Sequence, residues 1–237
     1  MSLDNKVVIV TGASSGIGRA TAHHLASLGA RLVLAARDAT ALNELEGALP
    51  GSLAIRTDVT SPEASARLVQ ETVSRFGRID VLVNNAGQAM AKPVEHIDLD
   101  EYTALLELNL IAPLRLMQLV IPQMRSQGGG QIVNISSQAS SKHIPYIAGY
   151  ASTKSALNTL SLTAREELAK DHITVSIVKP GIVDTDFGQN TPSPEPDNLR
   201  HAEDGTLLAH VIAPTTVAAA VANIIDSGDA EFDILHP

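Results

Sequence analysis

The fold is decided by a β-branched run that leads directly into a glycine cluster, Val7-Val-Ile-Val10 followed by Thr11-Gly12-Ala-Ser-Ser-Gly16-Ile-Gly18. The run predicts a buried strand, and apolar positions at helical spacing predict a helix from about Ile17 to Leu28. A strand that ends in a glycine-rich turn and continues into a helix is typical of the first βα unit of an open α/β sheet.

The three glycines predict a phosphate-binding loop. Gly12 lets the chain turn off the strand, Gly16 removes a Cβ where the backbone approaches a diphosphate, and Gly18 lets the helix pack on the sheet. The helix N-terminus offers unpaired N–H groups and a positive dipole end, and Ser14 and Ser15 add hydroxyl donors. A purely structural turn is the alternative, but the position between a strand and a helix favours nucleotide binding.

Short β-branched runs and longer helical patterns alternate along the rest of the chain. Strands are predicted at 31–36, 53–55, 79–83, 131–135, 173–178 and 231–235, and helices at 39–48, from 61 onward, 100–126, 150–170 and 215–225. Strands joined by helical crossovers predict a doubly wound parallel sheet of about seven strands with helices on both faces, in one domain over 1–237. The aperiodic segment 186–214 is expected to be a substrate lid, with a surface insertion as the alternative.

The composition excludes several classes of protein. The chain has 237 residues, 17 basic and 26 acidic side chains, and a net charge of −9, which disfavours nucleic acid and anionic membranes. The apolar fraction of 44% supplies a core, and the absence of cysteine excludes disulfides and thiolate metal sites. No signal peptide and no long uninterrupted apolar window are seen, and the histidines lack metal-ligand spacing. We expect a soluble cytoplasmic protein without a metal.

The end of the second strand bears on the choice of cofactor. An acidic side chain there would bind a ribose 2′-hydroxyl and repel a 2′-phosphate, whereas an arginine would attract the phosphate. This strand ends Ala35-Ala36-Arg37-Asp38, and Asp38 suits the N-cap of the next helix. We therefore expect NADP(H) to be preferred, with NAD(H) possible if Arg37 is only a solvated surface charge.

Tyr150 and Lys154 place a phenol and an ammonium four residues apart, on one face of a helix. An unperturbed tyrosine has a pKa of about 10, so moving its proton at neutral pH costs roughly 4 kcal/mol. A lysine charge at ~4 Å offers about as much. The pair can therefore make Tyr150 a general acid or base, unless it is an exposed tyrosine beside an unrelated lysine.

With these motifs in place, nearly the whole chain resembles the short-chain dehydrogenases/reductases. The matching motifs are Thr11-Gly12-x3-Gly16-Ile17-Gly18, Asn84-Asn85-Ala86-Gly87, Asn109, Ser137, Tyr150-x3-Lys154 and Pro180-Gly181-x3-Thr185. The resemblance implies a Rossmann-like strand order of 3-2-1-4-5-6-7, an NAD(P) cofactor and a homo-oligomer, most often a tetramer or a dimer.

The resemblance also implies roles for individual residues. Asn109, Ser137, Tyr150 and Lys154 would form a catalytic tetrad in which Tyr150 exchanges the proton, Ser137 binds the substrate oxygen and Lys154 also holds the nicotinamide ribose. Asn109 could instead be a core amide. The other expected cofactor contacts are Asp58 and Val59 beside the adenine, Asn85, Ala86 and Gly87 along the ribose, and Pro180, Gly181, Ile182 and Thr185 at the nicotinamide. Asp58 could instead only initiate a turn.

The expected activity is the interconversion of a carbonyl and a secondary alcohol, with the hydride carried by the cofactor and the proton by the protein. A nucleotide-sensing module that has lost catalysis is the first alternative, and a lyase or epimerase on the same fold is the second. The substrate, expected to be a small molecule, cannot be identified from the fold.

Overall fold

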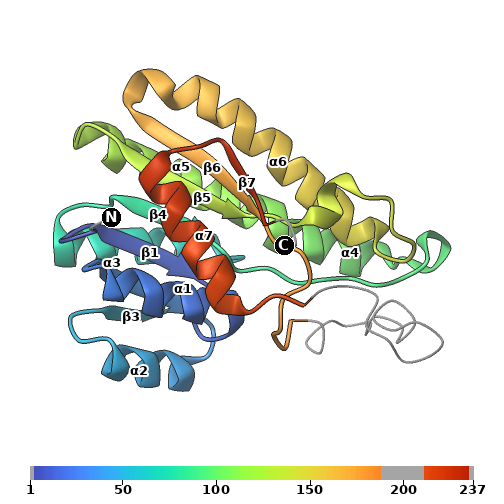
Figure 1. Cartoon of the computed structure of the whole chain (residues 1–237), viewed down its shortest axis with the longest axis horizontal. Helices are drawn as coiled ribbons and strands as arrows, with labels where there is room; N and C mark the ends of the chain where they lie inside the picture. Colours follow the sequence, from blue (N-terminus) through green and yellow to red (C-terminus); the bar gives the residue numbers. More distant parts are fainter. Residues whose placement is uncertain (1–2, 188–210, 235–237) are drawn as a thin grey trace.

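The computed structural model describes residues 3–187 and 211–234, so most of the predicted lid at 186–214 lies outside the described residues. Seven parallel strands form one sheet in the order β3-β2-β1-β4-β5-β6-β7 (Figure 1). They are β1 (Val7–Thr11), β2 (Arg31–Ala36), β3 (Leu53–Arg56), β4 (Val81–Asn84), β5 (Gly130–Ile135), β6 (Ile173–Lys179) and β7 (Glu231–Asp233). The predicted fold class and strand order are confirmed.

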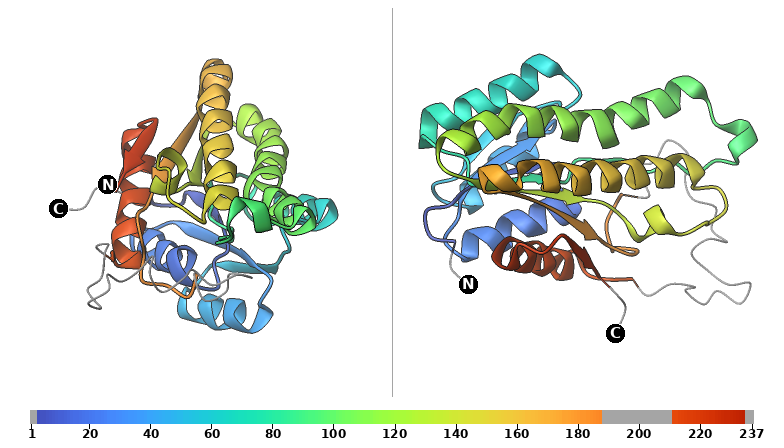
Figure 2. Two further views of the ribbon diagram at one scale, coloured as in Figure 1. Left: turned by 90° about the vertical axis from the view of Figure 1, so that its right-hand side faces the viewer. Right: turned by 90° about the horizontal axis from the view of Figure 1, so that it is seen from above.

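Helices cover both faces of the sheet, and the central strands β1 and β4 are buried on both sides. Along β1, Val8 and Val10 pack into one core with α1 (Gly16–Ser27), α2 (Ala39–Ala48) and α7 (Pro214–Ser227). Val7 and Ile9 pack into the other core with α3 (Pro62–Phe76), α5 (Ala112–Ser126) and α6 (Ala148–Leu168). Figure 2 shows the sheet between these two layers.

The helix ends follow local sequence signals. Asp38 caps α2 by accepting from the Ala41 N–H at 3.1 Å, as predicted. Ser61 caps α3 in front of Pro62, which needs no N–H donor in the first turn. Past the end of α1, Gly29 takes a left-handed φ of +90°, which glycine adopts without strain.

The helix predicted at 100–126 is not a regular α-helix. It is divided into α4 (Leu99–Leu106), a π turn (Glu107–Ile111) and α5. Pro113 has no backbone N–H to donate to the preceding turn. The Asn109 side chain hydrogen-bonds to the Gln88 backbone and does not face solvent. The extra residue of the π turn thus directs Asn109 inward.

The stretch Leu99–Ser126 is long and apolar enough to cross a membrane by length and composition alone. Its α5 part packs against the sheet through Leu116, Met117, Val120 and Met124, which are all buried. Through these contacts α5 packs on the core of the sheet.

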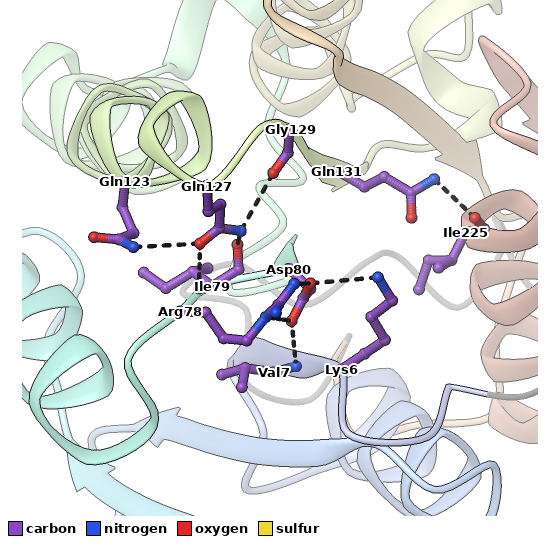
Figure 3. Close-up of polar contacts among 10 residues, drawn as sticks. All are labelled: Lys6, Val7, Arg78, Ile79, Asp80, Gln123, Gln127, Gly129, Gln131 and Ile225. Carbon is purple, nitrogen blue, oxygen red and sulfur yellow. Dashed lines mark hydrogen bonds and ion pairs between the residues drawn. The ribbon is translucent and has the colours of Figure 1, made fainter.

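The amino edge of the sheet, where β1 and β4 begin, is tied together by polar contacts (Figure 3). Asp80 accepts from the Val7 N–H at 2.9 Å and from both Nε and Nη2 of Arg78, at 2.8 and 2.6 Å. Lys6 lies 3.4 Å from the same carboxylate. The Gln127 side chain donates to the Ile79 carbonyl and accepts from its N–H. This network fixes where the two strands start.

Candidate active site

The glycine loop between β1 and α1 has the close packing that its sequence predicts. A Cβ on Gly18 would lie 2.2 Å from the Gly12 carbonyl oxygen, so a side chain there would displace the backbone. Gly12 and Gly16 have left-handed φ values of +64° and +51°. The Asn85 Nδ2 group donates to the carbonyls of Thr11 (2.9 Å) and Gly12 (3.3 Å) and holds the loop against the end of β4.

The N-terminus of α1 is open toward this loop. Ser15 occupies the N-cap position, but its side chain makes no capping hydrogen bond. The first-turn N–H groups of a helix have no partner within the helix, so Gly16, Ile17 and Gly18 present donors and a positive dipole end. Ser14 is half-buried and Ser15 exposed beside them. The loop thus fits the diphosphate of a dinucleotide.

The end of β3 brings the Arg56 side chain to the backbone of Arg37, at the end of β2. Arg37 is exposed after β2, and its carbonyl accepts from Nε of Arg56 at 3.2 Å. Sequence reasoning missed Arg56, because its proximity to Arg37 depends on the strand register that pairs Arg56 with Ala36. Asp58 is exposed and accepts from the N–H and hydroxyl of Thr60, which together with the charge of Arg37 keeps its pKa below the usual range despite partial burial. Asp58 thus initiates a turn, which is the alternative role that its sequence suggested. Val59, the next residue, is buried.

Lys154 is the most unusual charge in the molecule. It is 4% exposed, and among the described residues its one hydrogen-bond acceptor is the Ile135 carbonyl at 2.9 Å. An ammonium has three donors, so two remain available. Burial lowers the pKa of Lys154 to about 8. Gly87 leaves the approach open, since a Cβ there would stand 3.5 Å from Nζ.

Tyr150 stands on the same face of α6, and its ring centre lies 5.9 Å from Lys154 Nζ. The ring of Phe187 meets it edge-on, with centroids 6.1 Å apart. Ser137 follows β5 and is half-buried, and its Oγ accepts from the Ala139 N–H at 3.1 Å. The Oγ of the preceding Ser136 is buried without a partner.

Asn109 is fully buried and held from two sides. Its Oδ1 accepts from the Gln88 N–H at 3.0 Å, and its Nδ2 donates to the Gln88 carbonyl at 2.8 Å and to Thr153 Oγ1 at 3.1 Å. Thr153 lies on α6 next to Lys154 and also donates to the Tyr150 carbonyl at 2.8 Å. The tetrad helices are therefore linked by Thr153, which sequence reasoning did not single out.

The segment after β6, residues 180–185, lies against the glycine loop and the residues that follow β5. Pro180 is buried, and its carbonyl accepts from the Gln138 N–H at 2.9 Å. Thr185 stands against the glycine loop, 3.2 Å from where a Gly16 Cβ would lie. Gly181 is half-buried and Ile182 is 38% exposed between them. Ala86 completes the loop wall by donating its N–H to Thr11 Oγ1 at 3.1 Å.

The predicted tetrad and cofactor residues thus gather at the carboxyl edge of the sheet, where open α/β sheets bind their ligands. Within residues 3–187 and 211–234, no group of three or more His, Asp or Glu side chains is placed to hold a metal ion.

Comparisons with known proteins agree with this geometry. A family model described as short chain dehydrogenase matches residues 6–196. An uncharacterized oxidoreductase of Staphylococcus saprophyticus is 34% identical over 196 residues, 81% of this chain and 84% of that protein. The solved 7α-hydroxysteroid dehydrogenase complexed with NADH has a TM-score of 0.87 at 30% identity, over 98% of this chain and 94% of that one. The alcohol dehydrogenase of Thermococcus sibiricus complexed with 5-hydroxy-NADP has a TM-score of 0.84 at 29% identity, over 99% of both chains. The chain therefore belongs to the short-chain dehydrogenase/reductase family and is an NAD(P)-binding oxidoreductase.

Proposed function

We propose that this enzyme prefers NADP(H) and interconverts a carbonyl and a secondary alcohol, with Tyr150 as general acid and base. The observation that carries the proposal is the buried Lys154 ammonium, which keeps two donors unused beside the Tyr150 ring. A buried charge with so few partners is costly in a protein without a ligand. A bound cofactor with ribose hydroxyls would supply the missing acceptors.

The cofactor, when bound, supplies or accepts the hydride. The protein donates or accepts the proton. In the reduction direction, the Tyr150 hydroxyl donates a proton to the substrate oxygen, and Ser137 Oγ donates a hydrogen bond that orients this oxygen. In the oxidation direction, the same tyrosine oxygen accepts the proton from the alcohol.

Lys154 makes this transfer feasible near neutral pH. The ammonium lies 5.9 Å from the centre of the Tyr150 ring. At about this distance two unit charges interact by about 3 kcal/mol at an effective dielectric constant of ~20, which is most of what a tyrosine requires. Since the pKa of Lys154 is about 8, most molecules carry the charge at pH 7. Asn109 fixes the backbone at the π turn and anchors a water that connects Lys154 to solvent.

The preference for NADP(H) is supported by two arginines and a missing acid. Arg37 follows β2, and the Arg56 side chain at the end of β3 donates to the Arg37 backbone carbonyl. Guanidinium groups bind phosphates through charge-assisted hydrogen bonds. Asp38 is committed to the α2 cap and does not offer a free carboxylate to a ribose. Similar structures are solved with NADH and with an NADP derivative, so both cofactors belong in the assay.

We also propose a homo-oligomer, a dimer or tetramer, formed through α5 and α6. Both are longer than the strands they cover, and α5 leaves Leu114, Leu119 and Ile121 only partly covered. Sedimentation at micromolar concentration tests this. A monomer there would exclude it.

The catalytic proposal is tested by following NADPH and NADH oxidation against a panel of ketones, aldehydes and sugars. Tyr150→Phe keeps the ring and should retain folding and cofactor binding, but kcat should fall by the 10²–10⁴ typical of a lost general acid. Tyr102→Phe, a tyrosine of α4 whose hydroxyl bonds to Ser152, is the control and should stay active. If Tyr150→Phe keeps most of its activity, Tyr150 is not the general acid. If the wild type binds cofactor but reduces nothing, a nucleotide-sensing module is the better description.

A further inference from the structure

Tyr146, four residues before Tyr150, has a backbone conformation that tyrosine avoids. Its φ is +70°, and the other non-glycine residues with positive φ in the described ranges are Asn5 and His172. Asparagine and histidine tolerate the left-handed region better than a bulky aromatic residue does. Such a residue costs on the order of 1–3 kcal/mol and persists only where its surroundings impose it.

The surroundings impose the backbone but not the side chain. The Tyr146 carbonyl accepts from the Lys92 N–H at 2.7 Å. The next residue, Ile147, is buried and packs with Ala91 and Ala139 in the small cluster that includes Tyr150. A glycine at 146 could make the same hydrogen bond without strain. The tyrosine side chain therefore needs an explanation that the fold does not supply.

That side chain is exposed on a loop that lies beside the tetrad, because the neighbouring Ile147 packs in the cluster that includes Tyr150. The exposed fraction is 40% for Tyr146 and 39% for both Ile144 and Phe187. Val94, two residues beyond the hydrogen-bonded Lys92, is 73% exposed. Phe187 in turn touches the Tyr150 ring edge-on. Exposed apolar side chains thus lie on the loop that packs against Tyr150 through Ile147 and on Phe187, which touches its ring.

The two lysines of these loops already have side-chain partners. Lys92 forms an ion pair with Glu101, and Lys142 Nζ donates to the Gln138 side chain at 3.1 Å. A carboxylate or phosphate on the substrate would have to compete with these partners. An apolar group would instead gain by covering exposed rings, by about 25 cal/mol for each Å² removed from water.

We propose that Tyr146 is a specificity-determining residue, held in a strained backbone so that its ring forms an apolar wall beside Tyr150. The substrate class is then an uncharged carbonyl compound that carries a bulky hydrocarbon or aromatic group next to the reacting carbon. This inference rests on the proposed function, because it assumes that Tyr150 reacts with a carbonyl.

The test compares ketones of different size and charge on the wild type, Tyr146→Gly and Tyr146→Phe. The substrates are acetone, benzylacetone and phenylpyruvate, with NADPH or NADH, whichever the enzyme uses. For the wild type we expect kcat/KM to be at least tenfold higher for benzylacetone than for either other ketone. Tyr146→Gly should lower the benzylacetone value at least fivefold, mainly through KM, and leave acetone within twofold. Tyr146→Phe should behave as the wild type, because the wall needs the ring and not the hydroxyl.

Two further measurements separate specificity from folding. Glycine relieves the strain but adds freedom to the unfolded chain, so Tyr146→Gly should unfold at the same urea concentration as the wild type or a higher one. His172→Gly is the matched control. It replaces another exposed left-handed residue, at the opposite edge of the sheet, and should leave the ratio of the ketones unchanged.

The outcomes distinguish this inference from the proposed function. If Tyr146→Gly changes all three ketones alike, or if phenylpyruvate is preferred, the specificity inference is wrong while carbonyl reduction stands. If the wild type reduces no carbonyl compound at all, the proposed function fails and the inference fails with it.

Discussion

The two edges of the sheet handle polar groups in opposite ways. At the amino edge, Asp80 is 6% exposed and its carboxylate is saturated by Val7, Arg78 and Lys6. At the carboxyl edge, Lys154 is as deeply buried but has one acceptor, and Ser136 Oγ has none. At the amino edge the polar groups bond to one another and stabilise the fold, whereas at the carboxyl edge some donors and acceptors have no partner.

The comparison shows why a hollow alone does not identify a site. A hollow of about 480 Å³ lies at the amino edge, lined by Lys6, Arg78, Asp80 and Gln127 among others. Its charged and amide groups already bond to one another or to the backbone (Figure 3). Unused donors, rather than volume, mark the edge where a ligand stabilises the protein.

Lys154→Met gives the sharpest test of this difference, because it should lower activity and raise stability at once. We expect kcat to fall at least 10²-fold. Residual activity should move to alkaline pH, because losing the neighbouring positive charge raises the pKa of Tyr150. The cofactor-free protein should gain roughly 1–3 kcal/mol at pH 7, because a buried and poorly paired charge is removed. Urea unfolding without cofactor measures the gain.

The pH dependence of this gain has a definite sign. The lowered pKa of Lys154, about 8 against 10.5, means that the unfolded chain binds the proton more tightly. The wild type should therefore gain stability as the pH rises from 8 to 10.5, and its deficit against the variant should close. Lys170→Met, an exposed lysine beyond α6, is the control and should show neither effect. A less stable Lys154→Met at pH 7 would contradict the comparison.

Asp80→Asn should do the reverse at the amino edge. Losing the charged hydrogen bonds to Arg78 should cost about 2 kcal/mol of unfolding free energy, while kcat/KM stays within twofold. Burial would raise the pKa of Asp80, but the bonds from Arg78 and Val7 and the charge of Lys6 outweigh it and lower the pKa.

For this carboxylate the stabilisation is complete above about pH 4 and is lost as the pH falls through the lowered pKa. The stability gap to Asp80→Asn should therefore be largest near neutral pH and narrow only in strong acid. Asp226→Asn, an exposed carboxylate on the same hollow, serves as control. A large loss of activity in folded Asp80→Asn would show that the two edges are not separable.

Arg37→Asp probes a charge at the carboxyl edge that is exposed rather than buried. NADPH binding should weaken more than tenfold and NADH binding should be spared or improved, since the acid repels a 2′-phosphate. Arg56→Asp should act in the same direction but more weakly, and Arg75→Asp on α3 should not discriminate. Equal effects on both cofactors, measured by titration, would make Arg37 a surface charge.

Thr153→Val should have the smallest effect, because Thr153 acts only through Asn109 and the Tyr150 carbonyl, the two hydrogen-bond partners that the variant loses. Asn109 Nδ2 would keep the Gln88 carbonyl at 2.8 Å and lose only Thr153 Oγ1. We expect a threefold to tenfold lower kcat, on the order of 1 kcal/mol, with the pH profile displaced, and recovery in Thr153→Ser. If stability falls but the pH profile does not move, Thr153 serves only packing.

Local signals made much of this molecule predictable. The strand, glycine turn and helix around Gly12–Gly18 need only nearby residues, and so does the i, i+4 pair of Tyr150 and Lys154. The alternation of strands and helices was enough to predict a parallel sheet. The cap at Asp38 was also predictable, because it depends on the residues of one turn.

Features that depend on distant contacts could not be predicted. The π turn holds Asn109 against the Gln88 backbone, 21 residues away. Arg56 reaches Arg37 only through the pairing of β2 with β3. The left-handed Tyr146 is imposed by Lys92 across a loop contact. A helical pattern or a propensity carries no information on such contacts.

The packing of α1 against α7 has a consequence for the synthesis of the chain. The two helices lie side by side (Figures 1 and 2), and Ala22 and Leu25 of α1 share a core with Val217 and Val221 of α7. The helix that begins at the phosphate loop is synthesised almost 200 residues before its partner. Until α7 arrives, the apolar side of α1 faces water. A nascent chain stalled before α7 should therefore be a chaperone client that cannot yet hold a dinucleotide.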